Sequence, residues 1–134
     1  MRVRRWSVAL SFLIAVACTD SPTAAPAGAL LGHFGGTGAA LVGTASEVQF
    51  SIVCGTYRFP EALVPDAKGS FALGPILVPI GAGIQGAITL RGTVVNGRLD
   101  VEYRVLTRAA ATGSAHFVLT QNQPADYANQ GCAA

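Results

Sequence analysis

The chain has 134 residues, which leaves room for one domain of ordinary size and not for two. It carries nine basic and seven acidic residues, and without the N-terminal cluster Arg2, Arg4 and Arg5 it has six basic and seven acidic ones, a formal net charge of −1. Because binding to DNA or RNA requires a basic stripe, nucleic acid is excluded as an expected partner.

The first predicted element is a cleaved secretory signal, residues 1–17. The arginines precede Trp6–Ala17, which has 12 residues and no charge, and small residues come just before Cys18. As a helix this stretch spans about 18 Å, whereas the hydrocarbon core of a bilayer is about 30 Å thick. It is therefore too short for a permanent membrane span.

The signal ends in Ala15-Val16-Ala17-Cys18, which resembles the lipobox of bacterial lipoproteins, with Ala15 where that class usually has Leu. The resemblance implies that Cys18 becomes the N-terminus, with a diacylglyceryl group on its thiol and often a further acyl chain, such as palmitate, on its amine. Thr19 follows where Asp would favour the inner membrane, so the outer membrane is expected. The same residues fit an ordinary A-x-A cleavage site, which would give an unlipidated, secreted protein.

Residues 18–29 are predicted to be a flexible tether, since they are small or polar and include two prolines. Two acyl chains at Cys18 would hold this tether stably at a membrane. The remaining residues, 30–134, are expected to fold as a single domain in the cell envelope.

Within this domain apolar residues recur with a period of two, and no helical stripe is sustained. Ser46–Cys54 has one apolar face, which predicts a half-buried strand with a buried Cys54 at its end. A short strand at Leu41-Val42 precedes it, with a turn near Thr44-Ala45. Three further short strands are expected at Tyr57–Phe59, Ser70–Leu73 and Ile76–Ile80.

Two glycine-containing segments are predicted to be irregular. Gly32–Gly38 lacks the Lys and the following helix of a phosphate-binding loop, so a turn or bulge is expected. Gly81-Ala82-Gly83 indicates a flexible connection between strands, or a loop over a ligand cavity.

Asn96-Gly97 is the clearest hairpin signal, because both positions of a two-residue turn require positive φ. The turn predicts a register with apolar pairs on one face and polar pairs on the other: Val94 with Leu99, Leu90 with Tyr103, Ile88 with Val105, Arg91 with Glu102, Thr93 with Asp100 and Thr89 with Arg104. A slip by one residue would destroy both sets of pairs.

The last predicted strand is Ser114–Gln121, with Ala115, Phe117 and Leu119 facing inward and His116 outward. Altogether we expect about seven to nine short antiparallel strands. The predicted fold class is all-β, either a small sandwich or a small barrel.

The three cysteines, Cys18, Cys54 and Cys132, have different predicted roles. With Cys18 lipidated, the other two form an even pair in an oxidising compartment, and we expect a Cys54–Cys132 disulfide. It would close a loop of 79 residues, worth about 4.5 kcal/mol by chain entropy. Two free thiols, or a bond to Cys18, are the alternatives.

The body of the chain also resembles small, uncharacterised β-rich bacterial lipoproteins. The shared features are an aromatic-Gly-Gly opening, a strand ending in Cys, a Gly-x-Phe segment, a late hairpin and a terminal Cys, here Phe34-Gly35-Gly36, Phe50–Cys54, Gly69-Ser70-Phe71, Gly92–Leu99 and Cys132. This resemblance implies a compact antiparallel β fold and assigns no activity.

No catalytic, cofactor-binding or metal-binding residue is predicted. His33 and His116 are the two histidines, the zinc-type clusters of Cys and His are missing, and the carboxylates are scattered singly. The predicted role is structural or binding, without enzymatic activity and without a cofactor.

Two alternative functions remain open. One is a barrel that binds a small apolar ligand, lined by Phe50, Ile52, Leu90, Tyr103, Val105 and Phe117. The other is an envelope hydrolase, which would need a His, an acidic residue and a Ser in one cleft.

Overall fold

The structure is a computed structural model that describes residues 24–108, 111–128 and 130–131. The predicted signal, Cys18 and Cys132 lie outside these residues, as does the first part of the tether. Over the described residues, the protein contains no helix with the length and hydropathy that crossing a membrane requires.

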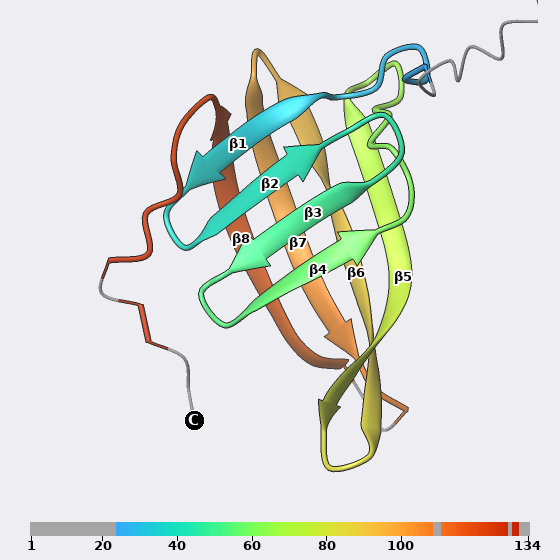
Figure 1. The fold of residues 1–134 in the computed structure, drawn as a ribbon, viewed down its shortest axis with the longest axis vertical. Helices are drawn as coiled ribbons and strands as arrows, with labels where there is room; N and C mark the ends of the chain where they lie inside the picture. Colours follow the sequence, from blue (N-terminus) through green and yellow to red (C-terminus); the bar gives the residue numbers. More distant parts are fainter. Residues whose placement is uncertain (1–23, 109–110, 129, 132–134) are drawn as a thin grey trace, which may run out of the picture.

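The domain is all-β, as predicted, and it is a nearly closed barrel of eight antiparallel strands (Figure 1). The strands are β1 (Gly32–Gly36), β2 (Ala39–Gly43), β3 (Val48–Ile52), β4 (Gly55–Phe59), β5 (Ser70–Gly81), β6 (Ile84–Val95), β7 (Arg98–Leu106) and β8 (Ala111–Gln121). Their order in the sheet is β4-β3-β2-β1-β8-β7-β6-β5, so nearly all neighbours in the sheet are neighbours in the chain.

Pairing of β1 with β8 joins the two halves of this up-and-down meander. Phe34 lies opposite Gln121 and Gly35 opposite Thr120. The opening of the barrel falls between β4 and β5, which are the two ends of the sheet and are connected by residues 60–69. Leu63 of this connection is fully buried, and Glu61 Oε1 accepts a hydrogen bond of 2.8 Å from the backbone N–H of Gly74 on β5.

The hairpin at Asn96-Gly97 forms in the predicted register, and all six predicted pairs of β6 with β7 are confirmed. Asn96 and Gly97 both have positive φ, 50° and 74°, as this turn requires. The inward pairs contribute Ile88, Leu90 and Leu99 to the core, each with no exposed surface.

The structure corrects the prediction for Cys54. β3 ends at Ile52, and Val53-Cys54 forms the turn to β4, because Ile52 already pairs with Gly55 across that turn. Cys54 is exposed instead of buried. The apolar alternation up to Ile52 was correctly assigned to the buried face, but it does not continue through a turn.

Two other predictions are corrected in the same way. Ser70–Leu73 and Ile76–Ile80 belong to one strand, β5, with a register shift between Leu73 and Ile76. Gly32–Gly38 is not mainly a turn: its first five residues form β1, which stays extended because β2 and β8 pair with it on both sides. The Gly81–Gly83 segment is a tight turn in which Gly81 pairs with Ile84.

The core lies where the short strands β1–β4, of five residues each, face the longer strands β5–β8. Among the described residues the buried apolar side chains form a single cluster, which consists of Phe34, Ala39, Leu41, Val48, Phe50, Phe59, Leu63, Phe71, Leu73, Ile88, Leu90, Leu99, Val101, Tyr103 and Leu119. The β5–β6 hairpin extends beyond this core, as Figure 1 shows at the lower end.

Candidate functional site

The outer face of β6, β7 and β8 carries a polar patch, which we define as Arg91, Thr93, Asp100, Glu102 and His116. The register places Arg91 beside Glu102, Glu102 beside His116, and Thr93 beside Asp100. With Gly92 these residues line a shallow hollow of about 250 Å³. The convergence follows from alternation, which puts every second residue of each strand on this face.

The ion pairs of the polar patch are exposed to solvent, and some of them involve residues outside the patch. His116 Nε2 lies 3.7 Å from Asp100 Oδ1, and their side chains are 63% and 42% exposed. The Arg104 Nε donates a hydrogen bond of 2.7 Å to Glu102 Oε1, so Glu102 pairs along its own strand instead of with Arg91, as the register had suggested. Exposed ion pairs of this kind contribute about 0–1 kcal/mol each.

The polar patch lacks the geometry of a hydrolase triad. Among the described residues, no hydrogen bond joins His116 to a Ser or Thr hydroxyl. Ser114 is two residues from His116 on β8 but lines a different hollow. The patch therefore has a His and an acidic residue together, without an activated nucleophile.

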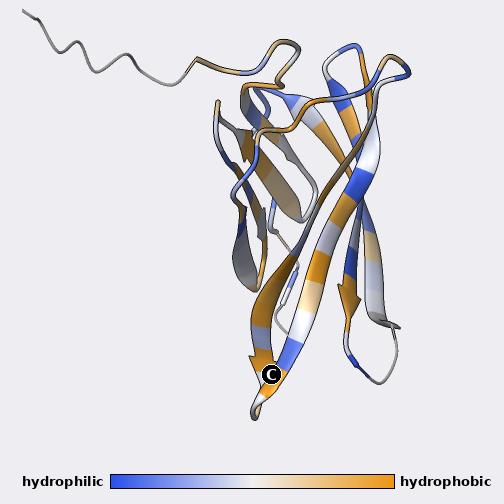
Figure 2. Cartoon of the chain, turned by 90° about the vertical axis from the view of Figure 1, so that its right-hand side faces the viewer, coloured by the Kyte–Doolittle hydropathy of each residue, from blue (hydrophilic) through white to orange (hydrophobic). Residues whose placement is uncertain are grey.

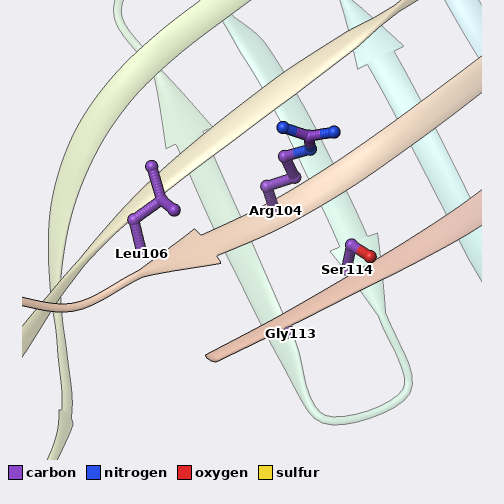
Figure 3. A pocket seen from close by; sticks show the side chains of 4 residues that line it. All are labelled: Arg104, Leu106, Gly113 and Ser114. Carbon is purple, nitrogen blue, oxygen red and sulfur yellow. The ribbon is translucent and has the colours of Figure 1, made fainter. Parts of the chain in front are cut away.

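That second hollow, of about 320 Å³, is lined by Arg104, Leu106, Gly113 and Ser114 (Figure 3). It lies beside the register shift between Val105 and Leu106, where β7 and β8 depart from regular pairing. Figure 3 shows Arg104 and Leu106 on β7 with Ser114 on the adjacent β8. Its one cationic group, Arg104, is already engaged by Glu102.

Four aromatic residues pack against one another inside the barrel. Phe50 stacks on Tyr103 at 5.9 Å and meets Phe117 edge-on at 5.8 Å, while Tyr57 stacks on Tyr103 at 5.6 Å. The Tyr103 hydroxyl donates to the Tyr57 hydroxyl at 3.2 Å. Burial, and then this hydrogen bond, raise the pKa of Tyr103 well above its usual value, so it remains a neutral donor.

The six residues predicted to line a ligand cavity belong to the core cluster or pack against it. Phe50 and Leu90 have no exposed surface, and Tyr103 has 9%. Ile52, Val105 and Phe117 are partly buried against the same cluster. Neither of the two hollows described above is lined by any of these six residues.

Three exposed apolar side chains, Leu77, Ile80 and Ile84, lie at the end of the β5–β6 hairpin, which we call the apolar tip. Their relative exposures are 72%, 41% and 55%. No charged residue occurs between Lys68 and Arg91. Figure 2 shows mostly hydrophobic colouring down this hairpin, beyond the rest of the barrel, and β6 carries an exposed polar residue there, Gln85. A solvent-facing sheet normally has one polar face, so this end is unusual.

Sequence reasoning missed the apolar tip, although a signal was present. Ile76–Ile80 is a run of five apolar residues without alternation. Such a run typically indicates a strand buried on both faces. The structure covers only one of its faces: Ile76 and Val78 are half-buried against the core, whereas Leu77 on the other face is largely exposed.

The remaining predicted site residues lie apart from one another. His33 is half-buried on β1, where its backbone carbonyl accepts a hydrogen bond from Asn122, and His116 faces outward on β8, as predicted. Cys54 is disulfide-bonded, but Cys18 and Cys132 lie outside the described residues, so its predicted pairing stays a prediction. In the part of the chain that the structure describes, no group of His, Cys, Asp and Glu could hold a metal ion.

Comparison with known proteins identifies no relative: no family model, no curated protein and no solved structure matches this chain. The resemblance of the sequence to small bacterial lipoproteins accordingly stays a prediction, and function is argued from the geometry.

Proposed function

We propose that the protein is a lipid-anchored binding domain of the bacterial cell envelope, and that its contact surface is the apolar tip of the β5–β6 hairpin. One observation carries the proposal: Leu77, Ile80 and Ile84 are exposed on a hairpin that extends past the core. Exposed apolar groups that protrude together mark interaction sites, since leaving them in water is unfavourable.

The N-terminal sequence supports the anchor. Cys18 follows a basic and apolar signal and precedes the predicted tether. The described part of the tether, residues 24–29, begins at the end of the barrel opposite the apolar tip (Figure 1). The described start of the tether and the proposed contact surface are thus at opposite ends of the domain.

The extracytoplasmic location is supported by the cysteines. Cys54 is disulfide-bonded, and disulfides persist in oxidising compartments. A lipidated Cys18 has no free thiol, so we propose Cys132 as the partner of Cys54, which would fasten the C-terminus to the β3–β4 turn.

The two alternative functions have less support. An apolar-ligand barrel would need interior space, yet Phe50 and Leu90 are fully buried within the core. A hydrolase would need a nucleophilic side chain hydrogen-bonded to His116. The side chain that His116 approaches is Asp100, on a solvent-exposed face.

Mass spectrometry and site-specific photocrosslinking in the native host test this proposal. We expect a mature chain that starts at a diacylglyceryl-modified Cys18. A photoreactive amino acid in place of Leu77 should give a crosslinked adduct, whereas the same group in place of Val95, which is 61% exposed on the opposite end of β6, should not. A chain without lipid would contradict the anchor, and equal labelling at the two positions would contradict the contact surface.

A further inference from the structure

We infer that the apolar tip inserts into the surface of a lipid bilayer. This inference rests on the proposal that the tip is the contact surface, and it identifies the partner as lipid. Its starting point is that the end of β5 exposes apolar side chains on both faces. Leu77 and Pro79 are exposed on one face, and Ile80 on the other face is 41% exposed, whereas Val78 next to it packs against the core.

A partner that surrounds the hairpin explains this pattern better than one that covers a single face. A protein groove that receives a sheet face buries that face and leaves the other in water. A bilayer surrounds an inserted element on all sides, so both faces gain from being apolar.

The length of the protruding hairpin fits shallow insertion. The pairing of β6 with β7 begins at Ala87 and Leu106, so residues 84–86 of β6 extend beyond β7. At about 3.3 Å per residue this overhang is about 10 Å long. Elements that lie in the membrane interface bury their apolar side chains about 5–10 Å deep.

The backbone of the overhang has its own hydrogen-bond partners, which lipid requires. Val78 pairs with Gly86, Pro79 with Gln85, and Gly81 with Ile84. β5 is an end strand of the sheet, and its free edge is the side where unpaired donors would be costly in hydrocarbon. Pro75 and Pro79 remove two backbone N–H groups from this strand.

The charges near the tip favour an anionic lipid surface. Within the segments 74–90, 104–108 and 113–115, the charged residues are Arg104 and Arg108. Both side chains are exposed, and Arg104 already pairs with Glu102, so the positive charge that remains for lipid headgroups is that of Arg108. Basic side chains next to an apolar element attract anionic headgroups and hold the element at the interface.

The tether is long enough for the tip to reach the membrane that holds Cys18. Eleven peptide units separate Cys18 from Ala29, and they span at most about 40 Å when extended. The 12 residues of β5 extend over a similar distance, about 40 Å. The tip therefore contacts either the anchoring bilayer, with the domain on its side, or a facing one.

Tryptophan fluorescence of the intact, processed protein in lipid vesicles tests the insertion. Trp6→Phe removes the native tryptophan, so that Leu77→Trp or Val95→Trp supplies the one reporter, however the N-terminus is processed. The vesicles contain zwitterionic phosphatidylcholine with or without anionic phosphatidylglycerol. We expect a blue-shifted emission for Leu77→Trp that lipids brominated on their acyl chains quench, and a water-like, unquenched emission for Val95→Trp.

Two further variants make the result specific to the tip. Ile84→Ser, combined with Leu77→Trp, should lower the insertion constant about tenfold, the factor expected when one isoleucine side chain loses its apolar surroundings. Arg108→Gln should reduce the preference for anionic vesicles about fivefold. Clustering of vesicles by the lipidated protein would show that the tip reaches a facing bilayer. Quenching of the tryptophan emission without clustering would show that the tip reaches the anchoring bilayer.

Failure of this inference is distinguishable from failure of the proposed function. Unquenched Leu77→Trp emission on a chain with a lipidated Cys18 would overturn insertion and leave the anchor intact. If crosslinking at position 77 then captured a protein, the tip would be a protein-binding surface instead. Quenching on a chain that is not lipidated would support insertion and overturn the anchor.

Discussion

Single residues decide how closely the strands of this barrel pack. Gly92 lies on the inward side of β6, where a Cβ atom would meet the backbone carbonyl of Asp100 and come within 2.9 Å of Phe71 Cζ. The backbone of β7 cannot move away from this contact without disturbing the β6–β7 pairing on both sides of it. A side chain at this position is therefore excluded by packing, independently of turn geometry.

We expect Gly92→Ala to lower the free energy of unfolding by about 1–3 kcal/mol, as overpacking does in other cores. Gly113→Ala is the matched control on β8, because nothing lies within 4 Å of the added methyl group there. Urea denaturation of the two variants measures the difference. Equal stability of both would show that the β6–β7 contact relaxes freely.

At the scale of elements, the connection between β4 and β5 closes the opening of the barrel. Leu63 has no exposed surface, and its carbonyl accepts a 2.8 Å hydrogen bond from the backbone N–H of Leu30, just before β1. Glu61, which belongs to the same connection, accepts a hydrogen bond from the backbone N–H of Gly74 on β5. Residues 60–69, a connection of irregular structure, thus cover the gap between the two unpaired edges of the sheet.

Leu63→Ala should cost about 2–4 kcal/mol of stability, since it removes a fully buried side chain and leaves a cavity. The neighbouring Val64 is 44% exposed, and Val64→Ala should change stability by less than about 0.5 kcal/mol. Thermal unfolding followed by circular dichroism compares the two. A loss for Leu63→Ala no greater than for Val64→Ala would mean that the connection does not seal the barrel.

At the scale of the whole molecule, one pairing between the two halves holds the barrel, and the proposed disulfide would add a second link. The β1–β8 pairing brings the first and last strands together. The proposed Cys54–Cys132 bond would restrict the unfolded chain over most of the domain, which is why it should matter more for stability than any single contact.

Cys132→Ser should therefore lower the free energy of unfolding by about 4–5 kcal/mol relative to the oxidised parent. Cys18→Ser is the control and should leave unfolding unchanged. Guanidinium denaturation with and without a reducing agent measures both. A comparable loss in Cys18→Ser, with none in Cys132→Ser, would assign Cys18 as the partner of Cys54.

The sequence was informative wherever structure is decided by neighbours in the chain. Asn96-Gly97 determines its own turn, and the alternation beside it fixes which side chains of β6 and β7 face inward. The same reasoning assigned His116 to the outer face. It did not predict that His116 would approach Asp100 instead of its direct neighbour Glu102, because that contact depends on side-chain directions across two strands.

By itself the sequence determined an all-β domain, its best hairpin register, and which residues could form a core, because alternation and turn chemistry are local. The tertiary structure decided that the sheet curves into a barrel, that Cys54 lies in an exposed turn, and that an apolar strand end remains uncovered. The physical reason is that the burial of a residue depends on which other residues lie opposite it in the folded structure. The short strands β1–β4 end before the β5–β6 hairpin does, and this difference between distant strands is invisible in any local pattern.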